Sequence, residues 1–417
     1  MILATSHPHL CAGYAGTSRR RGCSRHKRYP GGAINVTIRG VGSLNAGNTP
    51  LYVVDGIQIN TNLSGSIGGS SSSGSSDAVK TQNNPLAFLN PGDIESIEIL
   101  KDAASPAIYG AKAGSGVVIV TTKKGTTGKT KFDAHLSYGS LEATKLHKPL
   151  NTQEWLQNRI EGIVNTSGFR ITPDSARKTA LGEIGQPVTL TDKEISELNS
   201  TDWMKAGWGR GQIRDIDMSM QAGNPITSLY MSGSYSYQTS HIKPTNFERG
   251  TFLIKASHKV SKKVILDASV NLSTFSQDAN FGQGGGNNNT INTAYAATQI
   301  LPINPIYRSD GSFYGLANSG DAWYGSFANN PVSAAELLKI NVRTNQLIGG
   351  FSGTYNITSD ISLKSMVGLD YRLAQVKAFH DARLIGGIYA SVNGTGEAGS
   401  NWTTNFITTQ WLLIKKA

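Results

Sequence analysis

Some residue pairs and glycine turns in this sequence could belong to a catalytic or phosphate-binding site, but none completes a known motif. Gly40-Val41-Gly42 and Gly114-Ser115-Gly116 resemble parts of phosphate-binding loops. Neither continues into GxGxxG or GxxxxGK[ST], the patterns that place backbone N–H groups around a phosphate. The carboxylates that lie closest together form no persuasive pair for acid–base catalysis; they are Asp93, Glu95, Glu98 and Asp102.

Metal ligands are equally sparse. Beyond residue 30 there is no cysteine and no HExxH, and five histidines are scattered: His135, His147, His241, His258 and His380. Cys11 and Cys23 both lie near the N-terminus, so the body of the chain has no disulfide framework. We therefore expect a protein that is not an enzyme and that has no metal and no cofactor.

Composition favours a β protein. Charged residues are 16% of the 417, below the roughly 25% of soluble globular domains, and there are 47 glycines. No run approaches the roughly 18 apolar residues of a membrane helix.

The net charge of +11 is largely local, because residues 1–30 hold six basic residues and no acidic one, and the remaining 33 basic and 28 acidic residues leave +5. We interpret this anomalous basic segment as a start-site or frame error rather than a nucleic-acid or lipid-binding arm.

Residues 31–128 have the pattern of a small α+β unit. Short β-prone runs occur at Ile34–Arg39, Leu51–Val54, Ser96–Leu100 and Gly116–Thr122. Asp55-Gly56 is a turn pair after the second run. Asn90-Pro91 predicts a helix start, and Ala103–Tyr109 fits one or two helical turns closed by Gly110. A Ser/Gly-rich segment, 64–76, predicts a flexible loop.

Residues 129–417 alternate strictly between apolar and polar positions. Alternating stripes of roughly ten residues begin at Phe132, Leu229, Phe252, Val264, Leu347 and Ile361. The connections between the stripes alternate between long and short. Short turns are expected near 224–225, 260–263 and 358–360. A medium loop is expected at 239–250, and long connections follow the first stripe and span about 277–342. Strands of this length with such loops are typical of an up-and-down membrane barrel. Aromatic residues near strand ends fit its girdle: Tyr138, Tyr237, Phe252, Tyr355 and Tyr371.

The motifs of the first unit resemble the plug domain of TonB-dependent outer-membrane transporters of the SusC/RagA family. The matching pieces are NVTIRG (35–40), PLYVVDG (50–56) and NPGDIESIEILKDAASPAIYGAKAGSGVVIVTTKKG (90–125), of which the last is long and specific. The resemblance covers roughly residues 31–417. It implies a mainly β fold, with a partial plug at 31–128 and the first eight or nine strands of a barrel of about 22 strands at 129–417.

The resemblance also implies a function and partners. These are import of oligosaccharides or peptides across the outer membrane of a Gram-negative bacterium, a SusD-like surface lipoprotein, and the TonB–ExbB–ExbD energy-coupling complex. The segment that TonB contacts, the first half of the plug and the later strands are not recognisable here, so we expect this chain not to transport by itself. A passive porin, a siderophore-type receptor and a secreted β-rich carbohydrate-binding or adhesin protein are the alternatives.

Two sets of candidate residues follow from this resemblance. Charges at plug strand ends are candidates for pairing with the inner barrel wall, in contacts that hold the plug yet release it under force: Arg39, Asp55, Glu95, Lys101 and Asp102. Turn glycines and an aromatic residue complete the plug motif: Gly40, Gly56, Tyr109 and Gly110. Aromatic residues of the expected outer loops are weak candidates for substrate contact, and we favour packing of the loops against each other or against a lid as their role: Trp155, Trp203, Trp208, Tyr295, Tyr307 and Trp323.

Overall fold

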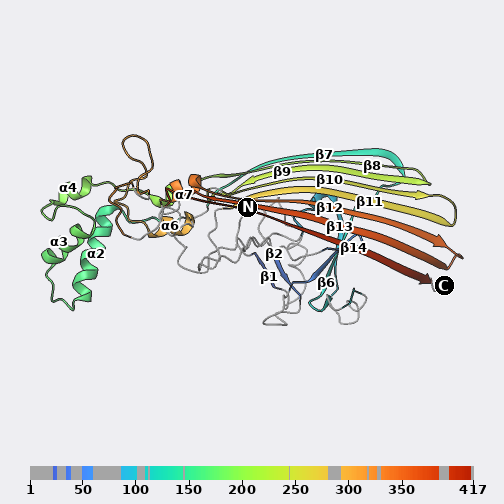
Figure 1. The fold of residues 1–417 in the computed structure, drawn as a ribbon, viewed down its shortest axis with the longest axis horizontal. Coiled ribbons are helices and arrows are strands. Elements are labelled where there is room, and N and C mark those ends of the chain that lie inside the picture. Colours follow the sequence, from blue (N-terminus) through green and yellow to red (C-terminus); the bar gives the residue numbers. More distant parts are fainter. Residues whose placement is uncertain are drawn as a thin grey trace.

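The fold is seen in a computed structural model, which describes residues 22–25, 34–38, 49–59, 86–100, 109–110, 113–143, 146–243, 245–279, 293–316, 319–325, 330–384 and 394–414. Four groups of elements make up these residues: a two-stranded ladder, a small sheet, a large sheet and a layer of helices (Figure 1). No described helix is both long enough and apolar enough to pass through a lipid bilayer. The mainly β fold class predicted from sequence is confirmed.

The small sheet, here called the plug sheet, has the order β4-β3-β6-β5. Its strands are β3 (Leu51–Val54), β4 (Ile57–Ile59), β5 (Ile94–Leu100) and β6 (Val117–Thr122). β3 runs parallel to β6, whereas the other two pairs are antiparallel. A separate two-stranded ladder joins β1 (Gly22–Arg25) to β2 (Ile34–Thr37). Three of the predicted β-prone runs are thus strands of this sheet, and Ile34–Thr37 is in the ladder.

Local residue chemistry explains the turns of the plug sheet. Asp55 and Gly56 both have positive φ, 50° and 88°, as the two-residue turn of a tight hairpin requires. Asn90 caps η1 (Pro91–Asp93) by accepting a hydrogen bond from Gly92 N at 3.1 Å. The predicted helix at Pro91 is only this 3₁₀ turn, because β-branched residues follow at once in β5. The predicted helix Ala103–Tyr109 and the loop 64–76 lie outside the described residues, except for Tyr109.

The large sheet, here called the wall, has eight antiparallel strands in sequential order from β7 to β14. They are β7 (Gly128–Leu141), β8 (Gly211–Gly223), β9 (Thr227–Thr239), β10 (Thr245–Lys259), β11 (Val264–Ala279), β12 (Leu338–Asn356), β13 (Ile361–His380) and β14 (Thr395–Ile414). The short turns predicted at 224–225, 260–263 and 358–360 join β8 to β9, β10 to β11 and β12 to β13.

The predicted strand length of roughly ten residues is wrong, because the wall strands have 13 to 20 residues. An apolar stripe covers only part of each strand. In β13 the outward face beyond Leu373 is interrupted by Gln375 and Lys377 before Phe379, so the regular apolar stripe ends before the strand does. The medium loop predicted at 239–250 is also shorter than expected, because β10 begins at Thr245 with polar residues.

Short helices and connecting segments form a layer at one end of the wall, opposite the short turns (Figure 1). The helices are α2 (Thr152–Thr166), α3 (Pro173–Glu183), α4 (Asp192–Glu197), α5 (Trp203–Gly207), α6 (Thr293–Gln299) and α7 (Pro331–Leu337). Asn151 and Thr191 begin α2 and α4 with capping boxes, each completed by a glutamate three residues later. We call this group the helical layer.

The main core lies between the plug sheet and one face of the wall, here called the inner face. It combines plug residues such as Val54, Ile57 and Phe88 with the wall residues Phe247 and Met366. The opposite face of the wall carries exposed apolar side chains on every strand. They include Phe132, Leu136, Ile216, Met218, Tyr235, Phe252, Leu272, Phe351, Tyr355, Leu363, Tyr371, Trp402 and Phe406.

Truncating the shared core should destabilise the fold. Phe88 is 1% exposed, so we expect Phe88→Ala to lower the free energy of unfolding by about 3–5 kcal/mol, as for other buried aromatic residues. Denaturant unfolding of the chain in detergent measures this change. Phe169→Ala is the control, because Phe169 is 77% exposed and its truncation should have little effect. Equal effects of the two substitutions would contradict a core between the plug sheet and the wall.

Candidate functional site

A buried ion pair joins the plug sheet to the wall. Lys255 lies on the inner face of β10, and its Nζ is 2.9 Å from Oδ1 of Asp55 in the β3–β4 turn. The two side chains are only 11% and 17% exposed. Lys255 Nζ also donates to the Thr122 carbonyl oxygen at 3.1 Å and to Thr122 Oγ1 at 2.7 Å. All three ammonium hydrogens therefore have acceptors.

Thr122 completes this contact from the end of β6. Its backbone N–H donates to Asp55 Oδ1 at 3.0 Å, and its hydroxyl donates to Asp55 Oδ2 at 2.7 Å. The Asp55 carboxylate thus has donors from both sheets, which compensates the loss of water around two buried charges. We call Asp55, Thr122 and Lys255 the ionic contact.

A second polar contact lies beside η1. Tyr230, on the inner face of β9, is fully buried, and its hydroxyl donates to Asp93 Oδ1 at 2.7 Å. Arg249, on β10, is 4% exposed and donates through Nη1 to the Leu89 carbonyl oxygen at 3.3 Å. Burial raises the pKa of Asp93 above its usual range, although the hydrogen bond from Tyr230 opposes this shift.

Close packing forms a third contact, at the β3–β4 turn. A Cβ on Gly56 would lie 3.2 Å from Met366 Sδ, and one on Gly368 would lie 2.9 Å from Ile57 Cγ1. The absence of side chains at Gly56 and Gly368 therefore lets the β3–β4 hairpin lie directly against β12 and β13. The three contacts together, which we call the plug seat, fix one orientation of the plug sheet on the wall.

The predicted plug residues divide according to where they lie. Asp55 contacts the wall, whereas Glu95 is exposed and forms no ion pair within the described part of the chain. Tyr109 packs on the face of the plug sheet that includes Val53 and Val117, and Gly110 has a positive φ of 74°. Three other predicted charges and one glycine lie outside the described residues: Arg39, Lys101, Asp102 and Gly40.

The wall partners Lys255, Tyr230 and Arg249 were not among the sequence-predicted residues. A usable signal exists, because strict alternation assigns each wall residue to a face. In β10 the apolar stripe of even-numbered residues, such as Phe252 and Ile254, lies on the outward face. The odd-numbered residues, including Arg249 and Lys255, therefore lie on the inner face. A charged residue on the inner face is a candidate partner for a charge on the plug sheet.

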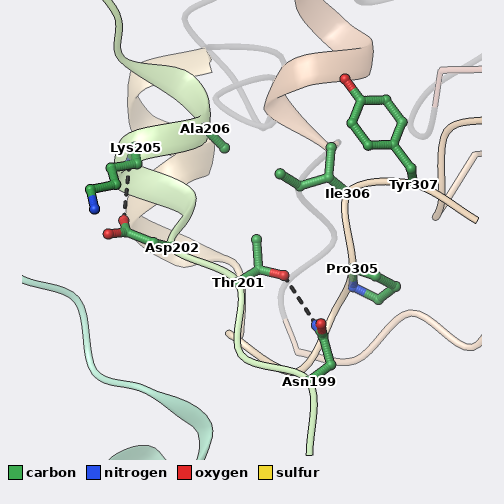
Figure 2. Close-up of a pocket in the computed structure, with 8 residues that line it drawn as sticks. All are labelled: Asn199, Thr201, Asp202, Lys205, Ala206, Pro305, Ile306 and Tyr307. Atoms are coloured by element: carbon green, nitrogen blue, oxygen red, sulfur yellow. Dashed lines mark hydrogen bonds between the residues drawn. The ribbon is translucent and has the colours of Figure 1, made fainter. Parts of the chain in front are cut away.

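A second candidate site is an open hollow of about 500 Å³ in the helical layer (Figure 2). Its lining combines polar and apolar side chains from two segments: Asn199, Thr201, Asp202, Lys205, Ala206, Pro305, Ile306 and Tyr307. Asn199 Nδ2 donates to Thr201 Oγ1 at 3.1 Å, and Asp202 Oδ1 accepts from Lys205 N at 2.9 Å. Asn199 Nδ2 and Thr201 Oγ1 also donate to backbone carbonyl oxygens of residues 302–304, so these two groups mainly hold the lining together. The Lys205 side chain and the Tyr307 ring are the lining groups of this hollow that can meet a ligand.

The aromatic candidates occupy different positions in the helical layer. Tyr307 lines the hollow and is 48% exposed. Its ring stacks on that of Phe313, with 5.5 Å between the ring centroids. Trp203 is 1% exposed and donates to the Leu301 carbonyl oxygen at 3.1 Å. Trp323 and Trp208 pack against the same cluster as Trp203, and Trp155 packs among α2, α3 and α4. Tyr295 is in α6, and its side chain is outside the described set.

The loop that carries Tyr307 is held by an internal ion pair. Arg308 donates to Asp321 through Nε at 2.9 Å and through Nη2 at 2.7 Å. The hydrogen bonds from the Arg308 guanidinium lower the pKa of Asp321 below its usual range. Within the described residues no group of three or more His, Cys, Asp or Glu is placed to hold a metal ion.

Comparisons with known proteins agree with the resemblance predicted from sequence. Residues 14–117 match the family model of the TonB-dependent receptor plug domain. TonB-dependent receptor P26 of Formosa agariphila is 28% identical over 368 residues, which are 88% of this chain and 32% of that protein. TonB-dependent receptor SusC of Bacteroides thetaiotaomicron is 28% identical over 371 residues, covering 82% of this chain and 31% of SusC. The chain spans about a third of the length of these curated relatives.

Solved structures show the same fold. The RagAB peptide importer in its closed-closed state matches with a TM-score of 0.66 at 20% identity, over 95% of this chain and 42% of that chain. Its open-open state matches with a TM-score of 0.64. The plug model begins at residue 14 and β1 lies at Gly22–Arg25, inside the basic segment, so a domain boundary at residue 30 stays a prediction.

Removing the cation of the ionic contact should weaken the plug seat. We expect Lys255→Met to lower the free energy of unfolding by about 3 kcal/mol, because the Asp55 carboxylate would stay buried without a cation. The double variant Lys255→Met/Asp55→Asn should regain part of this loss. Denaturant unfolding gives both values. Lys262→Met, in an exposed turn, is the matched control, and an equally small effect at Lys255 would contradict the ionic contact.

Proposed function

We propose that this chain, which resembles SusC/RagA-like TonB-dependent receptors over its plug and first wall strands, belongs to an outer-membrane importer whose plug leaves the wall when substrate passes. The observation that carries the proposal is the plug seat: a separate small sheet held on the inner face of an antiparallel wall by polar contacts. Ion pairs and hydrogen bonds hold a mobile part firmly in one position, yet water can replace them when the parts separate.

The exposed apolar face of the wall supports a place in a membrane. Side chains such as Phe132, Trp402 and Phe406 are each about 70% exposed and stand on the face away from the plug sheet. In a lipid bilayer this face would contact acyl chains rather than water. We propose the outer membrane of a Gram-negative bacterium as the location, because the similar proteins are TonB-dependent receptors.

The substrate class rests on the helical layer and on the similar importers. We propose oligosaccharides or peptides as substrates, with a SusD-like lipoprotein over the helical layer and the TonB–ExbB–ExbD complex as the source of force. The RagAB relative is a peptide importer, which favours the peptide. The hollow that Tyr307 lines combines polar side chains with an exposed aromatic ring, a combination that suits peptides and sugar rings alike.

Locking the plug to the wall should stop import. Position 57 lies within disulfide reach of position 368, since a Cβ on Gly368 would be 2.9 Å and 3.5 Å from the two γ-carbons of Ile57. We expect Ile57→Cys/Gly368→Cys, introduced with Cys11→Ser and Cys23→Ser into the importer that carries this chain, to abolish uptake when oxidised. Reduction should restore it. Radiolabelled oligosaccharide and peptide mixtures measure uptake in cells.

The reduced double-cysteine variant and Ile57→Cys alone control for the substitutions themselves, because Gly368→Cys beside the native Ile57 would itself disturb the contact. Uptake with and without a proton-motive-force uncoupler controls for energy. Uptake that continues through the oxidised protein, or that ignores the uncoupler, would favour a passive porin and reject the proposal.

A further inference from the structure

Asp93 is a buried carboxyl group whose surroundings differ from those of the ionic contact. It is 1% exposed, and one of its oxygens, Oδ1, accepts the hydroxyl hydrogen of Tyr230 at 2.7 Å. It follows Pro91-Gly92 in η1 and faces the inner side of β9. Unlike Asp55, it has no lysine or arginine within salt-bridge distance in the described part of the chain.

The second oxygen of Asp93 lacks a hydrogen-bond partner among the described residues, and so does the hydroxyl of Ser232. Both atoms are buried, and Ser232 lies near enough to the carboxyl group to lower its pKa. An ionised carboxylate can only accept hydrogen bonds, so a buried oxygen without a donor is costly. A serine hydroxyl can donate to an ionised carboxylate or accept from a neutral acid, so Ser232 fits either form. What favours the neutral form is that Asp93 is fully buried with no cation in salt-bridge distance among the described residues.

The charges around Asp93 act in both directions and do not by themselves select its protonation state. Asp215 and Asp217 project from β8 to the same inner face, and the buried guanidinium of Arg249 interacts with both of them and with Asp93. One arginine therefore faces three carboxyl groups. Lys123, just after β6, adds a positive charge that acts on Asp93 from the plug side.

Burial has a larger effect on the pKa of Asp93 than any of the facing groups. His135, on β7, lies 3.7 Å from Asp217 rather than at Asp93. Burial raises the pKa of Asp93 most, and the Asp217 charge adds to that shift, whereas Tyr230, Ser232 and Lys123 oppose it.

We propose that Asp93 is a proton-binding site of the plug seat: in the seated plug it is a neutral acid that donates from Oδ2 to Ser232 and accepts from Tyr230 at Oδ1. Seating transfers one proton from solvent to Asp93 Oδ2, and release of the plug returns that proton to solvent. The inference rests on the proposed function only for the movement of the plug. The proton itself belongs to the folded chain.

Linkage fixes the direction of the pH effect. Below the solvent value of about 3.9 for an aspartate, Asp93 is protonated in both the folded and the unfolded chain, so it contributes no pH dependence. As the pH rises above that value, the unfolded chain ionises and gains stability while the folded chain keeps its proton. Folding and seating therefore weaken with rising pH until the raised pKa of Asp93 is passed, and then level off.

Asp93→Asn tests the proposal with opposite signs for the two charge states. An amide reproduces the neutral acid, because its carbonyl oxygen accepts from Tyr230 and its NH₂ group donates to Ser232. In denaturant unfolding of the complete chain in detergent, we expect the variant to be at least as stable as the wild type at neutral pH. Relative to the variant, the folded-to-unfolded ratio of the wild type should fall by up to about tenfold per pH unit above about pH 4, before levelling off.

If Asp93 were ionised and attracted by Arg249 and Lys123, Asp93→Asn would be less stable than the wild type at neutral pH. That result would overturn the proposal. Glu95→Gln is the matched control, because Glu95 is an exposed carboxylate two residues away. It should leave the pH profile unchanged.

Infrared spectroscopy decides the question without comparing stabilities. The wild-type chain at neutral pH should show the carbonyl stretch of a protonated carboxylic acid, and this band should be missing from Asp93→Asn. If the asparagine variant does not fold, Asp93→Glu should shift the band. No such band in the folded wild type would refute the site. A band together with uptake that survives the disulfide lock would keep the proton site and reject the moving plug.

Discussion

The Lys255 ammonium group lies between two sheets, where few water molecules can solvate it, and the arrangement of the plug depends on that constraint. A buried ammonium needs acceptors at all three hydrogens, and here both the Asp55 carboxylate and two oxygens of Thr122 provide them. These acceptors exist only when the β3–β4 turn and the end of β6 meet at the same point. The register of β3 against β6 in the plug sheet is therefore coupled to the position of that sheet on β10.

The other contacts make this position specific. Hydrophobic packing between the plug sheet and Phe247 or Met366 buries apolar side chains but tolerates sliding, since dispersion forces have little direction. Hydrogen bonds from Tyr230 and Arg249 to the segment at Leu89–Asp93 have direction and therefore fix the orientation. Gly56 and Gly368 let the two sheets approach closely enough for those bonds to form.

In the helical layer, aromatic side chains stabilise the packing of short helices. Most of its aromatic residues are used to hold short helices together, since α4 and α5 are too short to be stable alone. Trp203 illustrates this role, because its ring is buried and its N–H bonds to a backbone carbonyl of the segment before Pro302. Tyr307 differs because Phe313 supports only one side of its ring, which leaves the phenol at the hollow.

The amino-acid sequence by itself determined most wall strands, the short turns and the resemblance, because these depend on local signals: alternation for β7 and for β9 to β13, Asp55-Gly56 for a tight hairpin, and the run 90–125 for the plug. No alternating stripe was predicted over β8 or β14. The sequence also marked Asp55 as a charge that needs a partner. It could not give the ends of the wall strands, since polar outward residues such as Gln375 and Lys377 carry no alternating signal. Only the tertiary structure decided that Lys255, more than 130 residues beyond Thr122, is that partner, and that Asp93 meets Tyr230 and Ser232. The alternation can place Lys255 on the inner face, but which inner residue meets which plug residue depends on which strands lie against the plug sheet, and the spacing within either segment does not encode that.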